Sequence, residues 1–341
     1  MLRNLTLQSI KTSLERVIIN AHGNSFIQLG LSPNIFLKDD GIDIIIEVTQ
    51  EMRHNQQNIQ TQIEKVLNKD YPNFKNVRII FTNKNNEKPI KVKQAIPSVK
   101  KIILMASAKG GVGKSTTAVN IAIALANQGF SIGIVDADIY GPTLPKLLGI
   151  TQIPDVVEDK MLPIKKYNIY SISIGYIINE DQAAIWRGPT ISKALYQLLL
   201  GVKWPEIDYM IIDMPPGTGD IYLTLAENFA IDGVVLITTP QDIAFKMMKK
   251  SISFFNKTNI PIIGIIENMS YFFDCKNNIR YNIFGNSISE SIVSKTEYKL
   301  LGNIPIIPKI SQFSDKGMNL LDEKEFEIYK KIAQELICNC G

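Results

Sequence analysis

Apolar positions follow two different patterns along the chain, one before about residue 83 and one after residue 100. In the first part, short apolar stretches at helical spacing alternate with stretches at strand spacing. The predicted helices are Leu5 to Ile19 and Asn58 to Leu67, and the predicted strands are Gly41 to Thr49 and Asn76 to Thr82. Residues 1–83 are therefore expected to form a small α/β domain.

From residue 100 onward, continuous apolar runs of strand length alternate with helical segments. The predicted strands are Ile102–Ala106, Ser131–Asp136, Asp208–Asp213, Gly233–Thr238 and Pro261–Glu267. This alternation predicts a mostly parallel, doubly wound sheet with helices on both faces. In such folds ligands collect at the carboxyl ends of the strands. A last amphipathic segment, Glu323 to Ile337, is expected to be a helix packed on this core.

Length and charge divide the chain into three parts. The 341 residues exceed what one hydrophobic core usually holds, so two domains are expected. Residues 84–99 form a basic linker between a domain at 1–83 and a domain at 100–341. Residues 84–101 carry six lysines and one acid, Glu87, which is a local charge of +5. A run of this kind is typical of a solvated linker, and the net charge of +4 does not require a nucleic-acid partner.

Other sequence features favour a cytoplasmic location. No segment approaches the roughly 20 apolar residues of a membrane span, and residues 1–19 lack the apolar centre of a signal peptide. The three cysteines, all late in the chain, do not make a disulfide framework, which fits a reducing cytosol. The two histidines, His22 and His54, are expected to be surface residues and not ligands.

The strongest chemical signal lies between the first predicted strand of the second domain and the helical segment after it. Residues 107–116 read Ser-Ala-Lys-Gly-Gly-Val-Gly-Lys-Ser-Thr, and a glycine-rich loop between a strand and a helix is the context of a phosphate-binding loop. Its backbone N–H groups and the helix N-terminus bind phosphate oxygens. Lys114 is expected to reach the terminal phosphates and Ser115 to bind Mg²⁺. The loop residues assigned to the nucleotide are Ala108, Lys109, Gly110, Gly111, Val112, Gly113, Lys114, Ser115 and Thr116.

Three carboxylates follow two of the predicted strands. Asp136 and Asp138 come directly after one strand, and Asp213 ends another. Asp136 and Asp213 are expected on the metal side of the nucleotide and Asp138 beside the attacking water. The loop after Asp213, Met-Pro-Pro-Gly-Thr-Gly-Asp, is stiffened by proline and suited to sensing the terminal phosphate. Asn268 ends a further strand, and its amide can both donate and accept, as recognition of a purine edge requires.

These motifs together resemble a known family. The loop beginning at Lys109 is similar to the deviant phosphate loop of the MinD, ParA and nitrogenase iron protein class. Within that class, the chain resembles the Mrp/ApbC iron–sulfur cluster carriers over residues 100–321. The motifs that carry this resemblance are Asp-Ala-Asp-Ile-Tyr-Gly-Pro-Thr from residue 136, Ile-Trp-Arg-Gly-Pro from 185, Asp-Met-Pro-Pro-Gly-Thr-Gly-Asp from 213 and Glu-Asn-Met-Ser from 267. Residues 1–83 are similar to the small iron–sulfur-assembly domain that often precedes this ATPase.

The resemblance implies a Mg²⁺-dependent ATPase that acts as a homodimer and passes iron–sulfur clusters to apoproteins. Lys109 would reach the nucleotide of the partner subunit, a cation meeting the charge that develops in phosphoryl transfer. Lys114 would hold phosphates, Asp138 would orient water and Asn268 would contact adenine.

The chain departs from this family where a Cys-x-x-Cys pair from each subunit usually holds a [4Fe–4S] cluster. Aligned from Asn268, Asp274 and Asn277 occupy the two cysteine positions, and Cys275 is displaced by one. Soft thiolates suit such a cluster, and one cysteine per subunit supplies only two. Cys338 and Cys340 would add ligands if the C-terminal tail folded toward the interface, or they form an exposed tail that binds nothing.

Two alternative functions stay open at this stage. A positioning or partitioning ATPase would act through a membrane or DNA, but a membrane form should end in a basic amphipathic helix and a DNA form should show a basic face. The tail Glu323 to Ile337 mixes four acids with three lysines. The second alternative is a nucleotide-gated adaptor that has lost its cluster. The altered cysteine segment keeps this alternative open.

Overall fold

The computed structural model describes most of the chain, which divides into two compact units at residues 1–90 and 91–341. The described residues are 7–19, 23–26, 28, 33–38, 41–48, 52, 55–72, 76–83, 93–178, 188–287 and 297–340. The expectations for His22, His54, residues 84–92 of the linker and the Ile-Trp-Arg segment at 185–187 lie outside the described residues.

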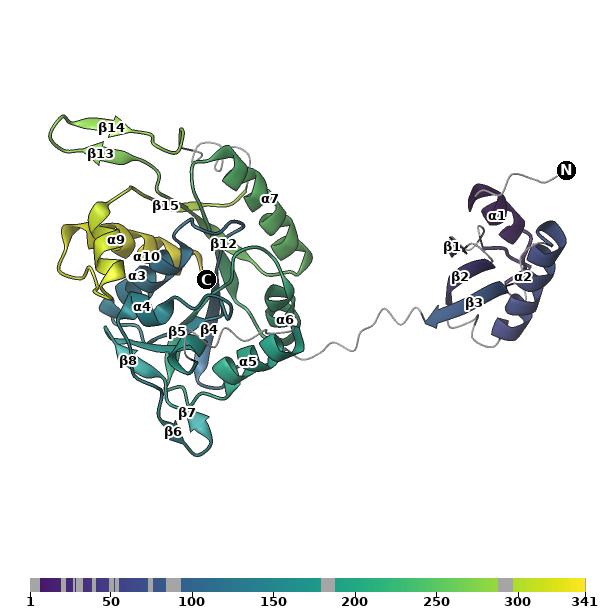
Figure 1. Cartoon of the computed structure of the whole chain (residues 1–341), viewed down its shortest axis with the longest axis horizontal. Helices are drawn as coiled ribbons and strands as arrows, with labels where there is room; N and C mark the ends of the chain where they lie inside the picture. Colours follow the sequence, from purple (N-terminus) through teal and green to yellow (C-terminus); the bar gives the residue numbers. More distant parts are fainter. Residues whose placement is uncertain are drawn as a thin grey trace. The chain divides into compact units, whose positions relative to one another are not determined.

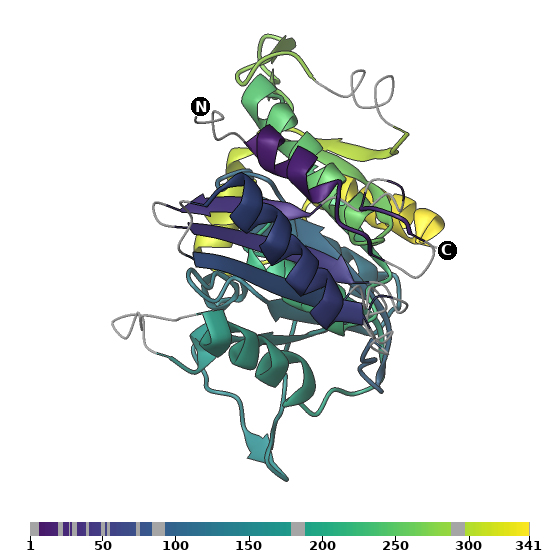
Figure 2. The same cartoon turned by 90° about the vertical axis from the view of Figure 1, so that its right-hand side faces the viewer.

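The first unit is a three-stranded sheet covered by two helices. Its elements are α1 (Leu7–Leu14), β1 (Asn34–Lys38), β2 (Gly41–Val48), α2 (Gln56–Asp70) and β3 (Asn76–Asn83). The sheet order is β1-β2-β3, with β1 antiparallel to β2 and β2 parallel to β3. Both helices lie on one face of the sheet (Figure 2). Apolar residues spaced three or four apart on α2, Ile59, Ile63 and Leu67, are completely buried against it.

One prediction for this unit was wrong in detail, and one strand was missed. The first helix ends at Leu14 and not at Ile19, because the chain turns there and Ile18 forms a bridge with Ser25. Val17 and Ile19 are still buried, so their apolar character reflects core packing outside a helix. Strand β1 was not predicted.

The second unit contains an eight-stranded sheet (Figure 1). The strands run in the order β15-β12-β11-β4-β10-β5-β9-β8. Their bounds are β4 (Val99–Ala106), β5 (Ile132–Asp136), β8 (Ile164–Lys166), β9 (Ile169–Ser173), β10 (Ile207–Asp213), β11 (Gly233–Thr238), β12 (Ile262–Asn268) and β15 (Leu300–Ile304). All neighbours are parallel except β8 and β9. The predicted mostly parallel sheet is confirmed.

Helices cover both faces of this sheet. On one face lie α3 (Lys114–Asn127), α4 (Leu144–Leu148), α9 (Pro308–Asp315) and α10 (Glu327–Asn339), and on the other lie α5 (Gly188–Leu200), α6 (Asp220–Asn228) and α7 (Asp242–Lys257) (Figure 1). Because both faces are covered, β11 is buried along its whole length, as the continuous apolar runs of the sequence require. The predicted terminal helix is confirmed, with Phe326, Tyr329, Ile332 and Leu336 buried.

The remaining elements are short. Two small hairpins project from the unit (Figure 1), namely β6 (Val156–Val157) with β7 (Lys160–Met161) and β13 (Phe272–Asp274) with β14 (Ile279–Tyr281). The described residues also include two 3₁₀ turns, η2 (Ile174–Tyr176) and η4 (Lys324–Phe326). The end of the expected linker belongs to this unit, since the Gln94 N–H donates to the Asn228 carbonyl (2.7 Å) and β4 begins at Val99. None of the helices that the structure describes has the length and apolar content needed to cross a membrane.

Candidate nucleotide site

The phosphate loop lies where the strand order of the sheet reverses. It follows β4, which has β11 on one side and β10 on the other, and it leads into α3. Gly111 and Gly113 have φ angles of 79° and 78°, in the left-handed region that residues with a side chain rarely adopt. These two glycines therefore allow the backbone to curl around a ligand at the N-terminus of α3.

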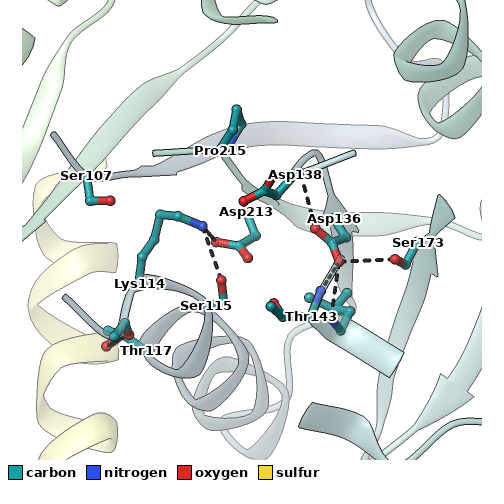
Figure 3. A network of polar contacts seen from close by, with 12 residues as sticks. Ser107, Lys114, Ser115, Thr117, Asp136, Asp138, Thr143, Ser173, Asp213 and Pro215 are labelled. Atoms are coloured by element: carbon teal, nitrogen blue, oxygen red, sulfur yellow. Dashed lines mark hydrogen bonds and ion pairs between the residues drawn. The ribbon is translucent and has the colours of Figure 1, made fainter. Parts of the chain in front are cut away.

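Lys114, Ser115 and Asp213 meet inside this loop (Figure 3). The Lys114 ammonium donates to Asp213 Oδ1 and to Ser115 Oγ, the latter at 3.2 Å. Both charged side chains are buried, at 7% and 0% exposure. Asp213 Oδ2 is buried and accepts no hydrogen bond from any residue that the structure describes. A buried carboxylate oxygen without a partner is costly unless a ligand or cation satisfies it.

The Asp136 carboxylate, unlike that of Asp213, accepts hydrogen bonds from several donors of the protein. Its Oδ2 accepts from the Thr143 N–H (2.9 Å), the Leu144 N–H (3.1 Å) and Ser173 Oγ (3.0 Å). Burial, and secondarily the negative charge of Asp213, raises the pKa of Asp136 to about 7. Asp136 therefore holds the turn between β5 and α4, and direct metal binding by this residue stays a prediction.

Asp138 lies two residues further and is less enclosed. Burial raises the pKa of its carboxyl, and the positive charge of Lys114 opposes this effect. A raised pKa makes a carboxylate a stronger base. Asp138 also lines a cavity of about 580 Å³ with Tyr140, Pro215 and Pro216, so the proline loop after β10 faces the same space. The role of Asp138 as a base beside the attacking water stays a prediction.

Asn268 ends β12 beside the phosphate loop. Its side-chain amide donates to the Val112 carbonyl at 2.8 Å, so one of its two N–H donors is used within the chain. The residue lines a cavity of about 570 Å³ with Gly113, Thr116, Met269 and Tyr329. Contact with a purine base stays a prediction, for which the amide oxygen and the second N–H of the amide are left.

Lys109 points to a residue that the sequence analysis did not single out. Its ammonium donates to Gln241 Oε1 at 3.0 Å, and both residues are half-buried. The Thr143 N–H was given no role, although Thr143 ends the motif that begins at Asp136. Gln241 and Ser173 were missed because their sequence surroundings carry no motif and their partners lie far away in the chain. Only the sheet order brings them to the phosphate loop.

The cysteines do not lie together. Cys275 is exposed in the turn of the β13–β14 hairpin, which follows the carboxyl end of β12. Cys340 lies at the other end of the sheet, because its carbonyl accepts from Lys101 near the start of β4 (2.9 Å). The tail of a single chain therefore does not supply ligands to the hairpin. In the described part of the chain no group of three or more His, Cys, Asp or Glu residues is placed to hold a metal ion.

Asp274 and Asn277 are the two residues that the sequence analysis aligned with the cysteine pair of the resembled family. The Asn277 side-chain amide donates to Asp274 Oδ2 (2.7 Å), and the Lys276 N–H donates to Asp274 Oδ1 (2.9 Å). These hydrogen bonds lower the pKa of Asp274, with the Asn277 side chain as the largest cause. The pair therefore closes the hairpin turn by hydrogen bonding.

Comparison with known proteins identifies the family of this chain. The family model described as "ParA: NUBPL iron-transfer P-loop NTPase" matches residues 98–339. The chain belongs to this family of P-loop NTPases.

Individual relatives extend the comparison. A protein of Rickettsia bellii named iron-sulfur cluster carrier protein is 43% identical over 291 residues, which cover 85% of this chain and 88% of the relative. An Escherichia coli K12 protein of the same name is 45% identical over 256 residues, covering 73% and 69%. These matches support the resemblance drawn from the motifs.

Solved structures share the fold of the second unit. A nucleotide-binding protein from Archaeoglobus fulgidus in complex with ADP is 30% identical with a TM-score of 0.60, covering 68% of this chain and 92% of that protein. The cell division ATPase MinD of Pyrococcus furiosus is 22% identical with a TM-score of 0.54, covering 70% and 98%. The likeness to MinD, at 22% identity, concerns the fold alone.

Proposed function

We propose that this chain is a Mg²⁺-dependent ATPase that carries iron–sulfur clusters to apoproteins and works as a homodimer. The observation that carries the ATPase part is the meeting of Lys114, Ser115 and the unpartnered Asp213 oxygen at the phosphate loop. The cargo rests on the iron-transfer family and on the relatives named iron-sulfur cluster carrier protein. A cytoplasmic location is part of the same proposal.

The residues at the loop suit a magnesium ion. Hydroxyl and carboxylate oxygens are the ligands that Mg²⁺ takes, and Ser115 and Asp213 offer one of each. The buried Asp213 Oδ2 has no donor within the described residues, which is the situation that a cation relieves. When bound, Mg²⁺ supplies positive charge to the phosphate oxygens.

The chain's own residues perform the other tasks. Backbone N–H groups of the loop and the N-terminus of α3 bind phosphate oxygens. Lys114, now paired with Asp213, turns to the terminal phosphates when nucleotide enters. Asp138 accepts a hydrogen bond from the attacking water and draws its proton toward the carboxylate. Lys109 of a partner subunit stabilises the negative charge that develops.

Hydrolysis is tested with the purified full chain and Asp138→Asn. We expect the wild type to release phosphate from ATP only when Mg²⁺ is present. Asp138→Asn should slow this release by a factor on the order of a hundred to ten thousand, because it removes the base. Binding of a fluorescent ATP analogue should be retained. Equal rates in the two proteins would refute the role of Asp138.

Cargo is tested separately by anaerobic incubation with iron and sulfide, followed by transfer to an apoprotein that needs a cluster. We expect a broad visible absorption band that passes to the acceptor. A colourless protein that still hydrolyses ATP would refute the proposal that the chain carries clusters, while the proposal that it is an ATPase would stand. That result would favour the nucleotide-gated adaptor, for which the hydrogen-bonded turn of Asp274 and Asn277 is the specific observation.

A further inference from the structure

Lys109 is held by its own chain and does not extend outward from the phosphate loop. Its ammonium lies 3.0 Å from the side-chain oxygen of Gln241. Its backbone is also fixed, because Ser107 Oγ donates to the Lys109 carbonyl at 3.1 Å. Gln241 is neutral, so the contact is a hydrogen bond from a charged donor to an uncharged acceptor and not an ion pair. Such bonds are among the stronger ones in proteins.

The sheet order explains why Gln241 is within reach. Strands β4 and β11 are parallel neighbours, with Leu236 paired to Ala106. The phosphate loop follows β4 and the turn containing Gln241 follows β11, so the two segments leave the same edge of the sheet side by side. More than 130 residues of sequence separate Lys109 from Gln241.

The side chain of Gln241 is not engaged in capping the helix that it begins. Gln241 is the N-cap residue of α7, in extended conformation, and its side chain makes no hydrogen bond to the helix. A side-chain cap usually stabilises a helix, and here the amide oxygen is directed to Lys109 instead. An ammonium beside a helix N-terminus is electrostatically unfavourable, and the amide oxygen offsets this repulsion.

We propose that Gln241 is a positioning residue that restrains Lys109 within its own subunit when no nucleotide is bound. Lys109 becomes available to a phosphate only when this hydrogen bond breaks. The proposal rests on the proposed role of Lys109 in hydrolysis. A hydrogen bond of this kind to a charged group favours the restrained position of Lys109 over the free position by about ten- to a hundredfold in population.

The restraint is measured directly by the chemical reactivity of Lys109. The nucleotide-free full chain is treated briefly with an amine-acylating reagent, and mass spectrometry gives the modification rate of each lysine. We expect Gln241→Ala and Gln241→Asn to raise the rate at Lys109 at least about threefold, because a free ammonium is more accessible than a bonded one. The rate at Lys100, an exposed lysine at the far end of β4, is the internal control.

Hydrolysis gives the second readout. Gln241→Glu converts the contact into an ion pair, so we expect kcat to fall about tenfold with little change in ATP affinity, and added salt to restore part of the rate. Gln241→Ala should keep or raise kcat. Asp242→Asn, which removes a neighbouring exposed charge without touching Lys109, should leave kcat unchanged within about twofold.

Two results would overturn the restraint. One is an unchanged Lys109 modification rate in both Gln241→Ala and Gln241→Asn. The other is a loss of hydrolysis in Gln241→Ala as complete as in Lys109→Ala, which would make the amide a requirement for the reaction. If Lys109→Ala itself hydrolyses ATP normally, the proposed role of Lys109 fails, while the modification rates still report on the contact.

Discussion

At the scale of single residues, Gly113 shows how closely the phosphate loop is fitted to its neighbours. Its φ angle is 78°, and a Cβ placed there would lie 2.3 Å from the Asn268 amide nitrogen. We expect Gly113→Ala to weaken ATP binding at least about tenfold, since left-handed backbone alone costs a side-chain-bearing residue about 1–2 kcal/mol. Titration with a fluorescent ATP analogue measures the change.

Gly129 provides a matched control for the backbone strain. It has a φ of 96° and nothing within 4 Å of its Cβ position, and it lies beyond the opposite end of α3. Gly129→Ala should therefore lower the free energy of unfolding by about 1 kcal/mol and leave ATP affinity unchanged. Equal affinities of Gly113→Ala and the wild type would mean that the loop moves away from Asn268 at no cost.

Lys109 carries the second prediction at this scale. Lys109→Ala should reduce ATP hydrolysis at least about a hundredfold while nucleotide binding stays within about twofold, because a cation that meets developing charge acts mainly in the transition state. Phosphate release and analogue titration measure the two quantities. Lys100→Ala, which removes a lysine paired with Asp208 at the other end of β4, should match the wild type. Hydrolysis that survives Lys109→Ala would remove Lys109 from the reaction.

Site residues that belong to a local motif were predictable from the sequence, and their long-range partners were not. Lys114 and Ser115 belong to a loop whose spacing indicates phosphate binding, and Asp213 ends an apolar strand. Gln241 has no such signature, because its partner is set by the pairing of β11 with β4. One of the three donors to Asp136 Oδ2 was also not predictable, since Ser173 lies on a strand that was not predicted.

At the scale of elements, the predicted strands are those with continuous apolar runs. Strand β9 escaped prediction because Ser171 and Ser173 interrupt its apolar pattern, although both are fully buried. Ser171 Oγ donates to the Ile164 carbonyl at 3.0 Å, and Ser173 Oγ donates to Asp136. Buried serines with partners are compatible with a core strand, but the partners become known only from the fold.

Helix α10 offers a test of element packing. Leu336 is completely buried, and α10 packs on α3 and β15. Leu336→Ala should lower the free energy of unfolding by about 2–5 kcal/mol, through lost burial and the cavity left behind. Urea denaturation followed by circular dichroism measures it. Gln334→Ala, an exposed position on the same helix, should change it by less than about 0.5 kcal/mol. A similar effect of both variants would mean that α10 does not form part of the core.

At the scale of the whole molecule, the sheet separates the Cys275 thiol from the thiols of Cys338 and Cys340 in the C-terminal tail. From Lys101, which contacts Cys340, to Ala106 at the end of β4 there are five residue steps, or about 17 Å of strand. Cys275 lies beyond the carboxyl end of the neighbouring strands. Thiolates that share one cluster must all lie within bonding distance of its irons. Within one chain, the two groups therefore cannot hold the same cluster.

Iron binding by cysteine variants tests this separation. After anaerobic incubation with iron and sulfide, Cys275→Ser should bind less iron per chain than the wild type, because it removes the only thiol on the hairpin. The double variant Cys338→Ser/Cys340→Ser should bind as much iron as the wild type and show the same visible band. Iron and sulfide analysis with absorption spectra measures both. Loss of the band in the double variant alone would place the cargo at the C-terminal tail, at the edge of the sheet away from the phosphate loop.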